Sequence, residues 1–257
     1  MSRKDGALVG RVIDAAGRGI SGAQLRVYAE EGTSELTSTT TDAAGAFEAG
    51  GLSPGAFRVV VRSAEHRTAS VTTALHRRGE RRKLLVALEP GRVLRGRVVN
   101  FERAPVAGAR VGVSDGLAGL ATTDADGVFE LRGLGGEPVN VYAVAPGYAP
   151  ARLSGSVPGT TDLELVLEPP AHVEGPLVAP ADGERVLVSL CRPAPSSGEA
   201  PCVARRLFPK DADHYVLDRL ASGDYELVAE VEGHTELRVP VRIRPGERVA
   251  GPPLAFR

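Results

Sequence analysis

The chain has 257 residues, a quarter of them charged, and its 31 basic and 32 acidic residues leave a formal net charge of −1. This balance provides no polycationic surface, so we expect no nucleic acid among the partners. Six Phe, five Tyr and no Trp are few for a platform that stacks sugars or bases.

The N-terminal segment lacks the apolar core of a signal peptide, because residues 1–6 read MSRKDG and a strand-like run begins by Leu8. No apolar run approaches the roughly 20 residues of a membrane helix. We therefore expect no membrane insertion, and the sequence as written carries no export address.

The first predicted strands lie in residues 8–29 and 57–61. Ala23, Leu25 and Val27 alternate with polar side chains, and a period of two predicts a strand with one buried face. Gly22 precedes this run and suits a point where the chain enters a crowded sheet face.

A turn is predicted at residues 41–47. Asp42 can accept a hydrogen bond from the backbone two residues on, and Gly45 supplies the positive φ that closes the turn. Both residues are therefore interpreted as structural. Phe47 and Phe57 are expected to fill the core.

Residues 51–55 spell G-x-S-x-G, the pattern of a nucleophile elbow around Ser53. An elbow needs a strand before it and a helix after it. Here the predicted strand 57–61 follows, so we interpret the motif as a turn and expect no catalytic residue.

Residues 76–83 form the only dense basic run. Charge on a loop and an edge strand is well solvated and blocks sheet-to-sheet aggregation. The alternative is a contact site for an anionic polymer or lipid headgroup through Arg77, Arg78, Arg81 and Arg82.

The next segment repeats the first. Residues 94–114 match 8–29 at an offset of 86, and 123–129 match 41–47 at an offset of 82. Asp124 and Gly127 are therefore predicted to form the same turn, and Phe129 to lie in the core. Residues 124–127 also resemble part of a calcium loop, but the remaining oxygen ligands of such a loop are missing.

A third, degenerate copy begins near Val173. It lacks the Thr-Asp-x-x-Gly turn and the Gly-Ala pair, but Leu220, Gly223 and Tyr225 match the first copy at an offset of 168. Tyr215 and Tyr225 are expected to lie in its core.

The two cysteines of the chain, Cys191 and Cys202, flank residues 192–201 in this copy. If Val188 and Leu190 face inward, Cys191 faces outward and Cys202 can oppose it across a hairpin. A disulfide here would add about 3 kcal/mol by the chain-entropy estimate, and two unrelated thiols are the alternative. Because disulfides persist in oxidising compartments, we expect an extracellular or periplasmic protein, with the cytoplasm as the alternative.

The five histidines are scattered, and none lies three or four residues from another: His66, His76, His172, His214 and His234. A zinc site needs three or four converging ligands. We therefore expect no metal site and no cofactor.

These patterns together predict an all-β protein. About seven short strands in each repeat of roughly 85 residues indicate two-sheet sandwiches. The repeat boundaries predict three domains, over residues 7–90, 91–170 and 171–257. The Glu-Pro sequences at the joints favour a semi-rigid, monomeric rod.

The motif series G-x-V, then I-S-G-A or V-A-G-A, then T-D-x-x-G-x-F, then L-x-P-G-x-F resembles the carboxypeptidase regulatory-like domain. The first two copies match it through most of their length, and the third copy matches only in its second half. The resemblance implies three tandem transthyretin-like (prealbumin-like) seven-stranded β-sandwich modules, of a kind found beside metallocarboxypeptidases and in bacterial envelope proteins.

The resemblance also implies a non-enzymatic surface or periplasmic repeat that acts as a spacer, a scaffold or a protein-binding module. Its partner would be a protein or a polysaccharide of the cell envelope. One alternative is a carbohydrate-binding module, which the absence of Trp disfavours and the expected exposure of Tyr28 and Tyr148 favours. The other is an accessory domain of a secreted carboxypeptidase.

Overall fold

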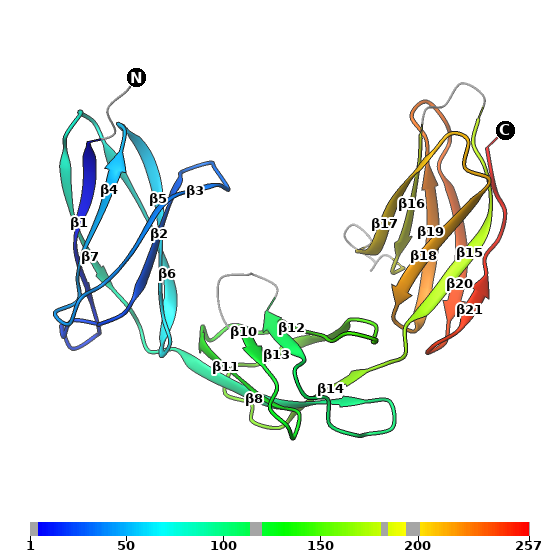
Figure 1. The fold of residues 1–257 in the computed structure, drawn as a ribbon, viewed down its shortest axis with the longest axis horizontal. Coiled ribbons are helices and arrows are strands. Elements are labelled where there is room, and N and C mark those ends of the chain that lie inside the picture. Colours follow the sequence, from blue (N-terminus) through cyan, green and yellow to red (C-terminus); the bar gives the residue numbers. More distant parts are fainter. Residues whose placement is uncertain (1–4, 114–119, 181–184, 194–200, 257) are drawn as a thin grey trace.

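The computed structural model describes residues 5–113, 120–180, 185–193 and 201–256, and every regular element within them is a β-strand. The strands form three successive groups, here called the first, second and third modules (Figure 1). Each module pairs two sheets around its own hydrophobic cluster. The predicted all-β class and the tandem sandwich architecture are confirmed.

The first module has a three-stranded sheet in the order β4-β1-β7 and a four-stranded sheet in the order β3-β2-β5-β6. Its first and last strands are parallel neighbours, and its other pairs are antiparallel. The strands are β1 (Gly6–Ile13), β2 (Gln24–Ala29), β3 (Glu35–Thr40), β4 (Ala46–Leu52), β5 (Gly55–Ser63), β6 (His66–Leu75) and β7 (Arg81–Ala87).

The second module repeats this topology, with sheets in the orders β11-β8-β14 and β10-β9-β12-β13. Again the first strand runs parallel to the last. The strands are β8 (Arg92–Asn100), β9 (Arg110–Val113), β10 (Leu120–Thr122), β11 (Val128–Leu134), β12 (Val139–Val144), β13 (Ala151–Ser156) and β14 (Leu163–Leu167).

The third module keeps both sheets, in the orders β18-β15-β21 and β17-β16-β19-β20, and adds a short strand beside β15. The last strand is thus split in two, and both parts run parallel to β15. The strands are β15 (Ala171–Val178), β16 (Arg185–Cys191), β17 (Cys202–Pro209), β18 (His214–Leu220), β19 (Gly223–Glu230), β20 (Leu237–Ile243), β21 (Arg248–Ala250) and β22 (Leu254–Ala255).

The alternation seen in the sequence explains these cores. In β2, Leu25 and Val27 are fully buried and Arg26 is exposed, and in β5 Val59 and Val61 face the same cluster. Because strand side chains alternate between the two faces of a sheet, this pattern turns one face of each sheet toward the module interior.

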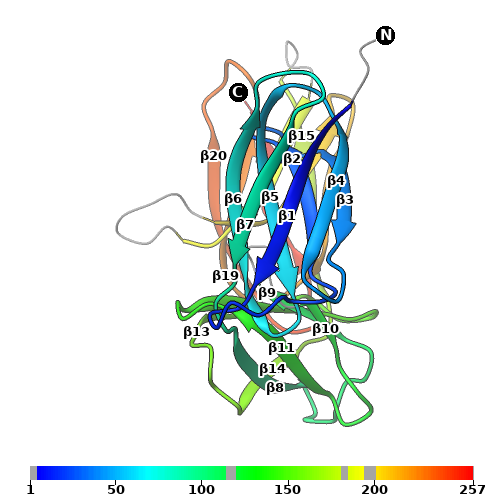
Figure 2. The ribbon, with the colours of Figure 1, turned by 90° about the vertical axis from the view of Figure 1, so that its left-hand side faces the viewer.

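The chain bends at both joints. Figures 1 and 2 show the first and third modules on the same side of the second, which forms the base of a U. The modules therefore do not lie in line as the expected rod requires, and they contact one another at the two joints.

Candidate functional site

The two predicted turns have the same hydrogen bonds in the structure. Asp42 Oδ1 accepts from the backbone N–H groups of Ala44 and Ala46, at 2.9 and 2.8 Å. Gly45 has a φ of 77°, and a Cβ there would lie 2.4 Å from the Val12 carbonyl oxygen. Asp42 thus closes the turn that leads into β4, and Gly45 lets this turn pack directly against the Val12 backbone of β1.

The second turn repeats the first. Asp124 Oδ1 accepts from the N–H groups of Asp126 and Val128, at 3.0 and 2.8 Å, and Gly127 has a φ of 74°. Among the described residues, no group of three or more His, Cys, Asp or Glu side chains converges as metal ligands. The Asp124 carboxylate closes the turn through these two hydrogen bonds.

A buried hydroxyl was missed at the residue before each aspartate. Thr41 Oγ1 accepts from the Ala23 N–H at 2.8 Å and donates to the Ile20 carbonyl at 2.6 Å. Thr123 makes the same two bonds, with Ala109 and Val106, at 2.8 and 2.7 Å. The recurrence of Thr with the I-S-G-A and V-A-G-A segments was the signal that could have revealed this link.

The role expected for Gly22 needs correction, and the same holds for Gly108, its equivalent in the second copy at an offset of 86. Their φ angles are 70° and 72°, and a Cβ at either position would meet no atom within 4 Å. Glycine is favoured there because the backbone is left-handed; crowding by a sheet face has no part in it.

The predicted core aromatics lie inside the modules. Phe47, Phe57 and Phe129 are 7%, 4% and 2% exposed, and Tyr215 and Tyr225 are 0% and 2% exposed. Tyr215 donates its hydroxyl to the Pro252 carbonyl at 2.9 Å. Burial raises the pKa of Tyr215 to about 12 and also raises the pKa of Tyr225.

Cys191 and Cys202 form a disulfide, as predicted, at the end of the β16–β17 hairpin. Cys191 is 3% exposed, so its sulfur is covered, but it is not a member of the third module's core cluster, to which Val188 and Leu190 belong. Leu190 pairs with Ala204 and Cys191 with Cys202, so β17 contributes one extra residue at this point, whereas β16 keeps its register with β19.

The basic run forms a compact turn and the start of β7. Glu80 accepts the backbone N–H groups of His76 and Arg77, at 2.7 and 3.0 Å. Arg81 donates two hydrogen bonds, at 2.9 and 2.7 Å, to Glu48 of β4, which lies on the other side of β1 in the same sheet, and this contact lowers the pKa of Glu48. Three of the four predicted anion contacts, Arg77, Arg78 and Arg82, are exposed without an ion pair to any described residue.

Ser53 lies in the turn between β4 and β5, and a strand follows it. Two histidine side chains each make a contact within their own turn: His66 Nδ1 lies 3.2 Å from Ser63 Oγ, and His214 Nδ1 lies 2.5 Å from Asp213 Oδ1. No described histidine is hydrogen-bonded to Ser53. The arrangement is that of a turn, and the described residues assemble no nucleophile and base around it.

The two tyrosines expected to be exposed are half-buried. Tyr28 has the Arg58 guanidinium 4.8 Å from its ring centroid, and Tyr148 packs against the core of the second module. Neither therefore presents a free ring to a sugar.

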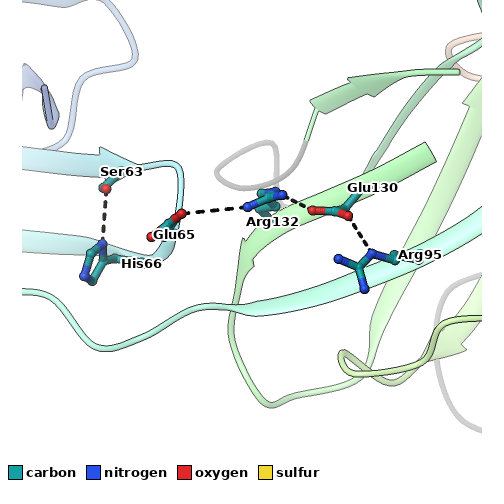
Figure 3. A network of polar contacts seen from close by, with 6 residues as sticks. All are labelled: Ser63, Glu65, His66, Arg95, Glu130 and Arg132. Atoms are coloured by element: carbon teal, nitrogen blue, oxygen red, sulfur yellow. Dashed lines mark hydrogen bonds and ion pairs between the residues drawn. The ribbon is translucent and has the colours of Figure 1, made fainter. Parts of the chain in front are cut away.

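A network of charged side chains joins the first module to the second (Figure 3). Arg132 of β11 reaches back to Glu65, in the β5–β6 turn, with 3.9 Å between Nη1 and Oε1. The same guanidinium pairs with Glu130, which also accepts from Arg95 Nε at 2.5 Å. The Arg95 hydrogen bond is the main cause of the lowered pKa of Glu130.

The backbones at this joint are also in contact. Gly91 N–H donates to the Glu65 carbonyl, and Arg67 N–H donates to the Glu89 carbonyl, each at 2.8 Å. Gly133 has a φ of 73°, and a Cβ there would lie 2.9 Å from the His66 carbonyl oxygen. The β5–β6 turn of the first module is therefore locked against the linker and β11.

The second joint repeats one contact of the first, that of Arg67 with Glu89, and adds two of its own. Ala149 N–H donates to the Glu168 carbonyl at 2.9 Å, and the Glu168 side chain accepts from Ser222 N–H of the third module at 3.0 Å. Gly246 N–H donates to the Pro169 carbonyl at 3.0 Å. Each Glu-Pro linker is thus held by the turn before it and by the module after it.

In the part of the chain that the structure describes, no helix is long and apolar enough to span a membrane. No curated protein matches the sequence. The family described as the carboxypeptidase regulatory-like domain matches residues 7–89 and 93–168, which are more than half of the chain.

The solved structures that match the chain have low sequence identity to it and low TM-scores. The Bacillus anthracis TIE protein is 16% identical with a TM-score of 0.29, and the match covers 98% of this chain and 50% of that one. A streptococcal ancillary pilin is 13% identical with a TM-score of 0.33, covering 97% and 98%. BcpA, the major pilin subunit of Bacillus cereus, is 10% identical with a TM-score of 0.32, covering 98% and 99%. The chain spans half the length of the TIE protein.

Proposed function

The chain belongs to the carboxypeptidase regulatory-like domain family, and from this premise we propose that it is a non-enzymatic spacer or scaffold of the bacterial cell surface or periplasm. In this role residues 7–90, 91–170 and 171–257 fold as three units. The joints hold these units at fixed angles, so that partners bound to different modules keep a set separation. No bond is made or broken.

The observation that carries the proposal is the backbone contact at both joints. At the first joint the Gly133 Cα hydrogens face the His66 carbonyl oxygen, with no room for a side chain. At the second, Glu168 bonds the third module through its side chain and the β12–β13 turn through its carbonyl. Flexible linkers need no such contacts, whereas a spacer of defined geometry does.

The disulfide supports the proposed location at the cell surface or in the periplasm. The bond between Cys191 and Cys202 is of a kind that persists outside the reducing cytoplasm. The motifs that resemble catalytic or metal sites are accounted for by turns, at Ser53 and at Asp124. These residues therefore give no reason to assign a reaction to the chain.

The experiment compares Gly133→Ala with Gly51→Ala, its equivalent in the first module. Both glycines are left-handed, with φ of 73° and 75°, but an added Cβ meets the preceding module only at Gly133 and meets nothing within 4 Å at Gly51. Spin labels carried by non-natural amino acids at Glu31 and Glu102 leave the disulfide intact. The distance between them is measured by pulsed electron resonance.

We expect one narrow distance distribution for the parent and for Gly51→Ala, and a shifted or broadened one for Gly133→Ala. The strain of a left-handed alanine is common to both variants, so the difference reports the joint alone. A broad distribution in the parent protein would contradict the proposed fixed geometry, as would equal effects of the two substitutions.

A further inference from the structure

A groove with a volume of about 620 Å³ lies between the second and third modules. One wall is formed by Ala151–Leu153 of β13 and by β14 with Glu168 after it. The other wall is formed by the start of β17 and by Arg219–Ser222 at the β18–β19 turn. Because Glu168 bonds Ser222 across the joint, the two walls are held together.

Arg219 occupies an unusual backbone position in this groove. It has a φ of 57°, and the equivalent positions in the first two modules are Gly51 and Gly133, with φ of 75° and 73°. A non-glycine residue pays an energetic penalty in this region, and such residues persist mainly at functional sites. In the third module this strained backbone conformation occurs at Arg219, whose side chain lines the groove.

The charges around the groove are predominantly positive. Arg152, Arg192 and Arg219 line it, all exposed, and none has an ion pair with a described residue. Of its two acidic residues, Glu164 is already paired with Arg103, a second left-handed arginine. Glu168 is engaged by the Ser222 N–H. The unmatched charge therefore favours an anionic occupant.

The form of that occupant follows from the strand beside the groove. β13 is the end strand of its sheet, so alternate backbone N–H and C=O groups point away from β12 and are available to an added strand. Each tyrosine of the groove already has a guanidinium group over its ring. The Arg152 guanidinium carbon lies 5.6 Å from the Tyr142 ring centroid, and that of Arg192 lies 5.6 Å from the Tyr225 ring centroid. These features favour a peptide backbone over a stacked sugar ring.

We propose that this groove binds an extended acidic peptide segment of a partner protein, which adds along β13 and pairs its carboxylates with Arg152, Arg192 and Arg219. The planar forks of arginine suit carboxylates in a bidentate arrangement. The inference rests on the proposed scaffold function and supplies its class of partner. It depends on the second joint, whereas the spin-label experiment tests the first.

The probe is a fluorescein-labelled ten-residue peptide of alternating Glu and Thr, because alternate residues of a strand share one face. Its binding to the full chain is measured by fluorescence anisotropy, with the Gln-Thr peptide as the neutral control. We expect saturable binding of the acidic peptide alone, weakening as salt is raised. Hydrogen exchange should slow in residues 151–156 when the peptide is bound.

The decisive variant is Arg219→Gly, which restores the residue found in the other two modules. It should raise the melting temperature or leave it unchanged, because the backbone strain is relieved, and it should weaken peptide binding about tenfold through the loss of one charge-assisted contact. Arg185→Gln, at the opposite end of β16 from Arg192, is exposed and should leave the affinity unchanged.

Four results would overturn the proposal. They are the absence of saturable binding of the acidic peptide, equal affinity of the parent and Arg219→Gly for it, binding without slower hydrogen exchange in β13, and preference for tetragalacturonate over the peptide. The last result would assign the groove to an acidic polysaccharide. If the parent protein does not bind the acidic peptide but keeps the narrow spin-label distance distribution, the proposed binding site is refuted and the proposed scaffold function is not.

Discussion

Thr41 and Thr123 tie together two motifs that are separate in the sequence. Each hydroxyl accepts from the N–H of the alanine after the left-handed glycine and donates to a carbonyl three residues before that alanine. Burying a hydroxyl that makes both hydrogen bonds costs little free energy. Removing the hydroxyl leaves a buried N–H and a buried carbonyl unpaired, which lowers the stability of the fold considerably. The third copy lacks the Gly-Ala pair and the Thr-Asp turn alike, as expected if each has value only with the other.

Thr41→Val and Thr123→Val should therefore each lower the free energy of unfolding of their module by about 1 to 3 kcal/mol, because a buried N–H and a buried carbonyl lose their partner. Denaturant unfolding of each variant measures this. Thr40→Val removes an exposed hydroxyl of the neighbouring residue and should change stability by less than about 0.5 kcal/mol. Equal effects at positions 40 and 41 would argue against the hydroxyl link.

Sequence patterns predicted which residues are buried better than they predicted what each residue contacts. The alternation of Leu25 and Val27 follows from local geometry, so it could be read directly. The Thr41 bonds join residues 18 and 21 positions apart, and the half-buried state of Tyr28 depends on Arg58 from another strand. Such contacts form only after the sheets assemble, so the alternation of side chains within one strand does not predict them.

At the scale of elements, the β16–β17 hairpin shows how a local irregularity sets a pairing. Strict alternation after Val188 and Leu190 places Cys191 on the outer face, and the extra residue of β17 brings Cys202 opposite it; Cys191 is nevertheless buried. The pairing itself could be predicted because both cysteines fall at the base of one hairpin. The burial could not, because it depends on what covers the outer face of β16 once the hairpin has formed.

Replacing both cysteines by serine should lower the free energy of unfolding of the third module by about 3 kcal/mol, since the bond closes a short loop in the unfolded chain. Urea unfolding with and without reductant measures the effect. Reductant should destabilise the parent protein and leave the double variant unchanged. If parent and double variant unfold at the same urea concentration, the disulfide contributes no stability.

At the scale of the whole molecule, the three hydrophobic clusters share no residue. The modules meet mainly through backbone hydrogen bonds and exposed ion pairs such as that of Glu65 with Arg132. Exposed pairs add little stability. Each module therefore derives most of its stability from its own core. The joints connect neighbouring modules without a shared hydrophobic core.

Alkaline pH should destabilise the third module selectively. Burial keeps the Tyr215 phenol neutral in the fold, with its pKa raised to about 12, while the unfolded chain ionises near a pKa of about 10. This contribution to stability is complete below pH 10 and is lost as the pH rises through about 12. In calorimetry between pH 9 and 11.5, the transition that reductant shifts should fall more steeply than the others, and Tyr215→Phe should reduce that slope. Parallel shifts of all transitions would contradict the assignment.

The parallel pairing of the first and last strands has a mechanical consequence. The chain enters the first module along β1 and leaves along β7, and these strands pair side by side over Ala7–Ile13 and Arg81–Ala87. Because the two strands are parallel, the start of β1 and the end of β7 lie at opposite sides of the module, and a pull on these two points slides one strand along the other. Their hydrogen bonds then carry the force together, where a hairpin would open one bond at a time. Each module thus acts as a shear-loaded link, suited to a tether under tension.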